Sequence, residues 1–284
     1  NSGDTKGRVV WEAECTVNWG SLLGKSQGRK DTKQAPILLL TGATGFLGSG
    51  LLARLCEAVA QRDGGGLEIW CLVRVKCGDA DDKSDDSDDA AASKSEEKTT
   101  DYFDADADCH LKRSLESREQ MTPVLCQALA NGTVRAVKGD LAHLHLGMES
   151  YSLFCHVASR VRCIVHCGCY VNHLFDYVTL KPTNVGSVDS LAEMCALSPE
   201  GAKPDFIYIS TISVLEDDAM AAEGEGSVDY VSSRQAGGYS QSKWVAEMRL
   251  RNYNDPAHNG ALFSSLTVVR PGIIGFDTRS GSAN

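Results

Sequence analysis

Short runs of apolar residues alternate along the chain with longer amphipathic segments. The runs are four to seven residues long and contain β-branched residues, which is typical of strands buried on both faces. They lie at 37–40, 67–73, 133–137, 163–166, 206–210 and 266–269. Helical periodicity fills the segments Leu47 to Gln61, Leu111 to Ala130 and Tyr239 to Asn252. Strands separated by helices predict βαβ units, so the expected fold class is α/β with a doubly wound, Rossmann-like parallel sheet.

Two segments do not follow this alternation. Residues 1–35 are polar and rich in glycine, and we interpret them as a linker that precedes one domain from residue 36 to 284. Between Gly78 and Asp108 there are thirteen acidic residues against three lysines, with few large apolar ones. Such a segment buries too little apolar surface to offset its ordering entropy, so we expect a disordered acidic insert at 78–108.

The formal net charge of -10 is concentrated in that insert. The rest of the chain carries 25 acidic and 25 basic side chains, so the folded part is expected to be neutral. A nucleic-acid-binding surface needs a basic patch, and we therefore expect no nucleic-acid partner.

The eleven cysteines lie in apolar stretches without a repeating frame, and no signal peptide is visible. This favours reduced thiols in a cytoplasmic setting over a disulfide scaffold. The apolar runs are also far shorter than the roughly 18 residues that a membrane span needs.

A glycine motif, TGATGFLG, lies directly between the first predicted strand and the first predicted helix, at residues 41–48. In this spacing Gly42 permits a tight turn, Gly45 lets the backbone approach a pyrophosphate, and Gly48 lets the helix pack against the strand. The helix N-terminus then offers N–H groups to the phosphates. The motif predicts dinucleotide binding. A second glycine motif, GSLLGKS at 20–26, resembles a nucleoside-triphosphate loop but has the wrong spacing and no preceding strand.

The residue after the second predicted strand indicates which dinucleotide is bound. A protein that prefers NAD places Asp or Glu there, whereas this chain has Arg74. A guanidinium suits a 2′-phosphate, so NADPH is the expected cofactor. After the third predicted strand, Asp140 is a candidate for contact with the adenine amino group.

Tyr239 and Lys243 lie four residues apart at the start of the last predicted helix, so both project from one face. A nearby ammonium, together with the charge of oxidised nicotinamide, is expected to lower the pKa of the phenol, which would then protonate the oxygen of a carbonyl undergoing reduction. The preceding strand ends in the hydroxyl-rich sequence YISTISV. Thr211 is the preferred candidate for binding the substrate oxygen, with Ser210 and Ser213 as alternatives.

A cluster of cysteines and histidines also invites interpretation as a metal site. Part of it lies in a predicted strand, where neighbouring side chains point to opposite faces and do not converge on one ion. We favour buried structural thiols and expect no metal. The cluster comprises Cys163, His166, Cys167, Cys169 and His173.

With these residues in hand, the chain resembles the thioester reductase domains of nonribosomal peptide and polyketide synthases, aminoadipate reductases and carboxylic acid reductases, within the extended short-chain dehydrogenase superfamily. The resemblance runs from residue 36 to 284, without the acidic insert. Its most specific block is HCGCYVNHLFDYVTLKPTNVGS, at 166–187, and Cys169 stands there where a small residue is commoner. The other similar segments are LLLTGATGFLG, CLVR, YISTISV, GYSQSKWVAE, VVRPGIIGFDTRSGSAN and the linker-like VWEAE at 10–14.

The resemblance implies NADPH-dependent reduction of a phosphopantetheine-bound acyl thioester to an aldehyde, or further to an alcohol. The implied partner is an acyl or peptidyl carrier domain, and the family's C-terminal substrate-binding portion is expected to be largely missing. Thr211, Tyr239 and Lys243 are the implied catalytic set. Further implied cofactor contacts, beside those named above, are Thr44, Phe46, Leu47, Leu141, Gly168, Tyr239, Lys243, Pro271 and Gly272.

Three alternatives stay open. A fatty acyl-CoA reductase would use the same site on a soluble thioester. A sugar-nucleotide epimerase or dehydratase would hold NAD tightly. A catalytically idle dinucleotide-binding module would need only the glycine motif.

Overall fold

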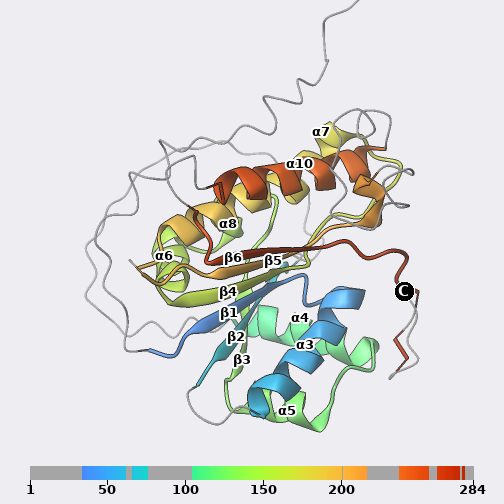
Figure 1. Cartoon of the computed structure of the whole chain (residues 1–284). Coiled ribbons are helices and arrows are strands. Elements are labelled where there is room, and N and C mark those ends of the chain that lie inside the picture. The colour runs from blue at the N-terminus through green and yellow to red at the C-terminus, as the bar shows by residue number, and fades with distance from the viewer. Residues whose placement is uncertain are drawn as a thin grey trace, which may run out of the picture.

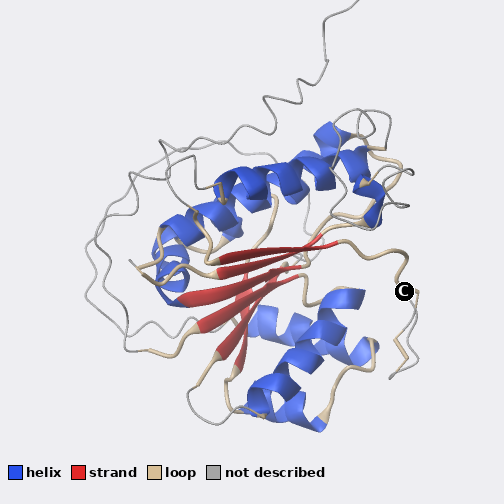
Figure 2. Ribbon diagram, viewed as in Figure 1, coloured by secondary structure: helices blue, strands red, loops and turns tan. Residues whose placement is uncertain are grey.

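The computed structural model describes residues 34–61, 66–75, 104–199, 201–215, 237–255, 261–275 and 277–278. Its centre is a six-stranded, fully parallel sheet with the strand order β3-β2-β1-β4-β5-β6, shown in Figures 1 and 2. The predicted α/β class with a doubly wound parallel sheet is confirmed. The strands are β1 (Ile37–Thr41), β2 (Glu68–Val73), β3 (Val134–Lys138), β4 (Val161–His166), β5 (Asp205–Ile209) and β6 (Ser265–Val269).

Helices cover both faces of the sheet (Figure 1). Side chains alternate between the faces, so Leu38 and Leu40 of β1 pack on one core while Ile37 and Leu39 pack on the other. The first core is covered by α3 (Phe46–Ala60), α4 (Ala105–Ser117) and α5 (Pro123–Ala130). The second is covered by α6 (Tyr151–Arg160), α8 (Ser187–Ala196) and α10 (Gly238–Tyr253). Shorter elements are η1 (Leu144–Gly147), α7 (Tyr177–Lys181), η2 (Pro182–Gly186) and η3 (Ile212–Val214).

Side-chain caps begin several of these helices. Asp104 accepts a hydrogen bond from the Ala107 N–H, and Thr122 and Ser150 do the same for the third residues of α5 and α6. Such caps satisfy backbone donors that have no partner inside the helix. The beginning of α3 differs, because its cap residue Gly45 has no side chain to offer.

Three details of the sequence interpretation are wrong. The expected insert reaches too far, because Asp104 already caps α4 and Asp108 lies inside it; its remainder lies outside the described residues, as do residues 1–33 of the expected linker. The single helix expected from residue 111 to 130 is two helices. Pro123 disfavours helical conformation at the preceding residue, so α4 ends and α5 begins with Pro123 in its first turn.

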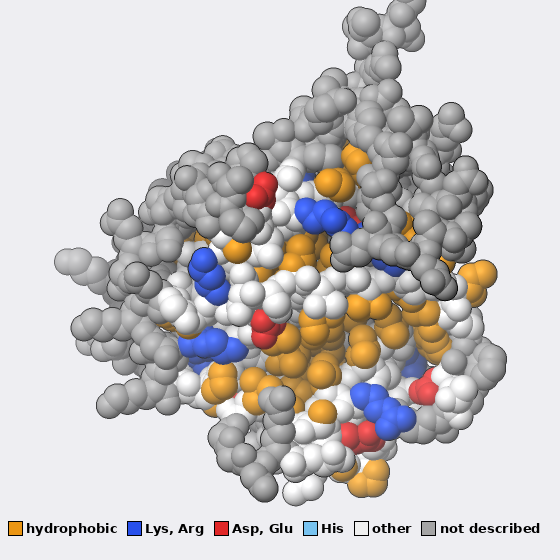
Figure 3. All heavy atoms as spheres, viewed as in Figure 1, with side chains coloured by type: hydrophobic (Ala, Val, Ile, Leu, Met, Phe, Trp, Pro, Cys, Tyr) orange, Lys and Arg blue, Asp and Glu red, His pale blue; other side chains and the backbone are white. Residues whose placement is uncertain are grey.

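The third error concerns β6, which was expected to be buried on both faces. It is an edge strand of the described sheet and pairs with β5 alone there. Its residues alternate between exposed and half-buried, and Val269 is 42% exposed. Figure 3 shows the molecule from the same side as Figure 1. On the face seen there, hydrophobic side chains gather across the middle, between the levels of α10 and α3.

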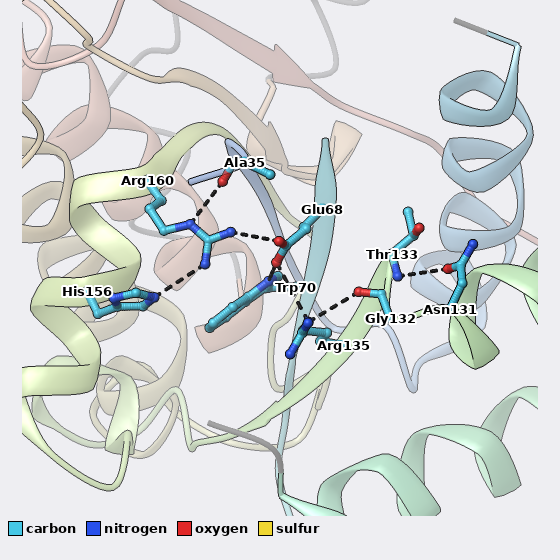
Figure 4. A network of polar contacts seen from close by, with 9 residues as sticks. All are labelled: Ala35, Glu68, Trp70, Asn131, Gly132, Thr133, Arg135, His156 and Arg160. Atoms are coloured by element: carbon cyan, nitrogen blue, oxygen red, sulfur yellow. Dashed lines mark hydrogen bonds and ion pairs between the residues drawn. The ribbon is translucent and has the colours of Figure 1, made fainter. Parts of the chain in front are cut away.

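A polar network closes the amino edge of the sheet, where the strands begin (Figure 4). The Glu68 carboxylate lies 2.9 Å from the Arg160 guanidinium and accepts a hydrogen bond of 2.7 Å from the Trp70 indole. Arg160 also donates to the Ala35 carbonyl, at 2.9 Å, and its guanidinium lies 5.3 Å from the Trp70 ring centroid. This network ties the start of β2 to the chain just before β1 and β4.

The strand order reverses between β1 and β4, whose loops leave toward opposite faces of the sheet. In open parallel sheets ligands bind at the carboxyl edge at such a switch point. The fold therefore directs attention to the ends of β1 and β4. Among the helices described, none is long and apolar enough to cross a membrane, and the cytoplasmic setting stays a prediction.

Candidate active site

The turn after β1 has the geometry that its glycines predict. Gly42 has a φ of 76°, and the Gly45 N–H donates to the Gly42 carbonyl oxygen at 2.9 Å. A Cβ at position 48 would lie 2.0 Å from that same oxygen, so only glycine fits there. Because Gly45 caps α3 without a side chain, the first N–H groups of the helix have no side-chain cap. This arrangement fits the pyrophosphate of a dinucleotide.

The end of β4 closes against this turn. A Cβ at Gly42 would lie 2.7 Å from the Gly168 nitrogen, so two glycines from different βα units touch there. The Gly168 N–H donates to the Thr41 hydroxyl at 3.0 Å, and that hydroxyl is hydrogen-bonded to His166 Nδ1 at 2.7 Å. The other ring nitrogen lies 3.2 Å from the Ser187 hydroxyl on α8. Burial, reinforced by the Lys243 charge, lowers the pKa of His166 to about 3, so the ring is neutral.

A pocket of about 560 Å³ opens at this edge of the sheet. Every residue predicted to contact the cofactor or to take part in catalysis lines it. The structure therefore brings the predicted set together, although their roles stay predictions. The predicted lining residues are Gly42, Thr44, Gly45, Phe46, Leu47, Gly48, Arg74, Asp140, Leu141, Gly168, Thr211, Tyr239, Lys243, Pro271 and Gly272.

Tyr239 and Lys243 lie on one face of α10, and their exposed fractions are 9% and 1%. The Lys243 ammonium donates to the Ile209 carbonyl oxygen at 2.7 Å and lies 4.7 Å from the Tyr208 ring centroid. Ile209, the last residue of β5, thus fixes the position of the Lys243 ammonium on the same helix face as Tyr239.

The pKa of Tyr239 reflects two opposing effects. Burial raises it to about 12, and the Lys243 charge lowers it, as expected, without outweighing burial. The charges of Cys169 and Tyr208 and a hydrogen bond with Cys169 add to the increase. The lysine alone therefore does not offset desolvation of the phenolate, and a lowering by the lysine and oxidised nicotinamide together stays a prediction. At neutral pH the phenol is protonated, which is the form that donates a proton.

The three hydroxyl candidates after β5 differ in their surroundings. The Thr211 side chain begins η3, where its oxygen accepts from the Ser213 N–H at 3.2 Å. Ser213 itself is exposed. The Ser210 hydroxyl is buried and has no hydrogen-bond partner among the described residues. All three line the pocket, so the choice of Thr211 stays a prediction.

A buried ion pair supports the catalytic side of the pocket. Glu247 follows Lys243 by one helical turn, and its side chain is fully buried. It accepts hydrogen bonds from Arg270 at 2.7 and 3.0 Å. Because Arg270 directly precedes Pro271 and Gly272, this pair fixes the pocket wall formed by the chain after β6.

Asn184 is a structural residue of the site that motif reasoning did not single out. Its side chain accepts from the Tyr170 N–H at 2.7 Å and donates to the Tyr170 carbonyl and the Ser242 hydroxyl. It lies in η2, a π-helical turn, and such turns often occur at functional sites. The only sequence signal was its place in the block 166–187. Tyr170, Val171, His173 and Thr183 also line the pocket without having been predicted.

At the outer end of the pocket, Arg74 is exposed and follows β2 as predicted. Asp140 accepts a hydrogen bond from the Ala142 N–H at 2.9 Å, so its carboxylate holds the turn after β3. Its predicted contact with adenine stays a prediction.

The three cysteines of the cluster are half-buried rather than buried, whereas His166 is buried and His173 is exposed. Cys167 and Cys169 line the pocket, which leaves them partly accessible. Burial raises the pKa of Cys163 to about 11 and that of Cys167 to about 12, so both thiols are protonated at neutral pH. Across the described ranges, no three His, Cys, Asp or Glu side chains form a group that could hold a metal ion. The nine described cysteines are free thiols.

Comparison with known proteins places this arrangement in a family. The family model described as "Male sterility protein", an NAD-binding domain, matches residues 40–284. The chain belongs to this family. It is 27% identical over 269 residues to the large subunit of L-2-aminoadipate reductase from Penicillium chrysogenum, and 29% identical over 230 residues to the carboxylic acid reductase of Mycobacterium marinum. These alignments cover 88% and 78% of this chain.

Among solved structures, the terminal R domain from the myxalamid polyketide–nonribosomal peptide pathway superposes with a TM-score of 0.64 and 26% identity. The superposition covers 96% of this chain and 58% of that domain. The chain spans 15% and 17% of the two curated relatives. The resemblance inferred from the motifs is thus confirmed, and the chain is an NAD(P)-binding domain distantly related to these reductases.

Proposed function

We propose that this domain catalyses NADPH-dependent reduction of a carrier-bound acyl thioester to an aldehyde. One observation carries the proposal: Tyr239, Lys243 and Thr211 line the same pocket as the glycine turn after β1. A dinucleotide whose phosphates bound at that turn would lie in the same pocket as the Thr211 hydroxyl and the Tyr239 phenol. The kinship with aminoadipate and carboxylic acid reductases favours a thioester as the group reduced.

The residues of this chain would act on the carbonyl oxygen of the thioester. The bound cofactor supplies a hydride to the carbonyl carbon. Thr211 and protonated Tyr239 donate hydrogen bonds to the oxygen as negative charge develops there. Tyr239 then supplies the proton, which its pKa of about 12 keeps available at neutral pH. Cleavage of the carbon–sulfur bond releases the aldehyde and the free thiol of the carrier.

Lys243 contributes by charge and position. Its ammonium is held by the Ile209 carbonyl and stabilises the phenolate left after proton transfer. Without this charge, the buried phenolate would be still less favourable. Lys243 therefore helps Tyr239 to lose and regain its proton in each turnover, although burial disfavours the phenolate.

We infer that the cofactor is NADPH rather than NADH. Arg74 follows β2 at the position where a carboxylate would repel a 2′-phosphate. The partner would be an acyl or peptidyl carrier domain that presents its phosphopantetheinyl arm at the pocket. A second round of reduction to the alcohol would use the same residues.

The test is consumption of NADPH by the natural polypeptide that carries these residues, supplied with an acyl-carrier thioester, an acyl-CoA or no acyl substrate. We expect turnover with the carrier thioester, and Tyr239→Phe should reduce it by about 100- to 10,000-fold while NADPH affinity stays within about twofold. Preference for acyl-CoA would favour the fatty acyl-CoA reductase. Tightly retained NAD would favour an epimerase, and unaltered turnover of Tyr239→Phe would refute the catalytic assignment.

A further inference from the structure

Arg118, at the end of α4, reaches the glycine turn from a distant part of the chain. Its Nε donates a hydrogen bond of 3.1 Å to the carbonyl oxygen of Thr44, which lies 74 residues earlier. Thr44 is one of the turn residues that line the pocket. Arg118 thus lies beside the glycine turn, bound to a residue that lines the pocket although it is not itself among the lining residues.

The turn that carries Arg118 is held firmly. Glu119 adopts a φ of 55°, a left-handed conformation that costs a residue other than glycine about 1 kcal/mol. Gln120 is 2% exposed; its N–H donates to the Leu115 carbonyl, and its amide donates to the Arg118 carbonyl at 3.2 Å and to Asp277 at 2.7 Å. These contacts fix the backbone of Arg118 rather than leaving it on a frayed helix end.

Arg118 is not held in an ion pair within the described part of the chain, although the Asp277 carboxylate is bound by Gln120 two residues further on. No acidic side chain among the described residues forms an ion pair with it, whereas Arg135 and Arg160 pair with Glu68, and Arg270 pairs with Glu247. The bond to Thr44 uses Nε alone and leaves the two terminal nitrogens as donors. A guanidinium of this kind is suited to a phosphate.

We propose that Arg118 is a second cationic contact for the 2′-phosphate of NADPH and acts together with Arg74. This inference rests on the proposed cofactor. Thr44 relates the two arginines to one site, because it lines the same pocket as Arg74 and accepts a hydrogen bond from Arg118. The pair replaces the single arginine expected from the sequence, and Arg118 determines specificity for the phosphorylated dinucleotide.

Equilibrium binding of NADPH, NADH and 2′,5′-ADP tests this role. Arg118→Gln removes the charge but keeps a donor for the Thr44 carbonyl, and Arg118→Ala removes both. We expect either variant to weaken NADPH and 2′,5′-ADP by about tenfold, with NADH affinity within about twofold. The affinity for NADPH should also become less sensitive to salt. The matched control is Arg113→Ala, five residues earlier and exposed on α4, where its guanidinium contacts Cys109. This variant should leave all three affinities unchanged.

The possible results separate this inference from the proposed function. Equal weakening of NADPH and NADH by Arg118→Gln would overturn it, because the arginine would then only support the turn. Unchanged NADPH affinity in both variants would overturn it as well. If the unaltered protein bound NADPH but not NADH and lost this preference only in Arg74→Ala, the cofactor assignment would stand without Arg118. If the unaltered protein bound no dinucleotide, both proposals would fall.

Discussion

The two edges of the sheet use polar groups in opposite ways. At the amino edge, Glu68, Arg160 and Trp70 satisfy one another in a network that ties strand starts together (Figure 4). At the carboxyl edge, the helix α3 begins without a side-chain cap, and the Ser210 hydroxyl has no hydrogen-bond partner among the residues described. Polar groups that already form hydrogen bonds or ion pairs within the protein add to its stability. Polar groups without a protein partner are available to bind a ligand. Changes at the amino edge should therefore affect stability alone, whereas changes at the carboxyl edge should also affect binding.

The largest effect is expected from breaking the network of the amino edge. Glu68→Gln removes the charge that faces Arg160, whose side chain is only 5% exposed. An uncompensated buried charge should lower the free energy of unfolding by about 3 kcal/mol, measured by urea denaturation. Affinity for NADPH, measured under native conditions, should not change.

A charge pair on the surface provides the control. Glu57 pairs with Arg54 at 2.9 Å on α3, where the arginine side chain is 65% exposed. Glu57→Gln should change stability by no more than about 0.5 kcal/mol. A similar loss in both variants, or a loss of NADPH binding in Glu68→Gln, would contradict the division between the edges.

The next effect is expected at the carboxyl edge, from Gly48→Ala. The new Cβ would collide with the Gly42 carbonyl oxygen, so the turn must shift. We expect a loss of about 2 kcal/mol in stability and no measurable dinucleotide binding in calorimetry. Gly50→Ala, on the same helix, meets no atom within 4 Å and should be neutral or slightly stabilising. Retained NADPH affinity in Gly48→Ala would show that the turn does not hold the phosphates.

At neutral pH no effect is expected from the titration of His166, which joins the turn after β1 to α8, and its effect appears only as the pH falls. Its pKa of about 3 lies below the value of roughly 6.5 in an unfolded chain, so the unfolded state takes up a proton first as the pH falls. Its stabilisation is complete above pH 6.5 and should decline by about 1.4 kcal/mol per pH unit below it. Urea denaturation between pH 7 and 5 should show this slope.

A variant without the titrating ring isolates the contribution of His166. His166→Asn should be less stable at pH 7 but should lack that part of the pH dependence. The pKa of His156 is also lowered, and its share of the slope remains in both proteins. Parallel curves for the variant and the unaltered protein would show that His166 is not the group responsible.

The parts that were predictable from the sequence are those with a local cause. A strand and its turn could be predicted from Ile37 to Leu40 and from Gly42 to Gly48. Burial and a positive φ each restrict which residue types can stand at those positions. Pro123 also marked the break between α4 and α5, although the apolar periodicity across it suggested one helix. The edge position of β6 could not be predicted in this way, because its apolar residues are of the same types as those of a central strand.

Partners distant in sequence were not predictable. The spacing of Tyr239 and Lys243 shows that they share a helix face, but the burial that raises the pKa of Tyr239 comes from the surrounding fold. Arg118 and Thr44 are 74 residues apart, and Asn184 and Ser242 are 58 apart. In neither pair does the sequence around one residue identify its partner. Such contacts are therefore found only from the folded structure.

The open side of β6 has a consequence for handling the protein. Backbone donors and acceptors on the side of that strand away from β5 have no strand partner within the described sheet, and Val269 is 42% exposed. Unprotected rows of this kind act as templates on which another extended chain can add itself. The polar side chains of Ser265 and Thr267 separate the apolar side chains of β6 and should reduce its tendency to associate. Self-association of the described sheet at high concentration would therefore begin along β6 rather than at the strand starts, where the network of Glu68, Arg160 and Trp70 already satisfies the polar groups.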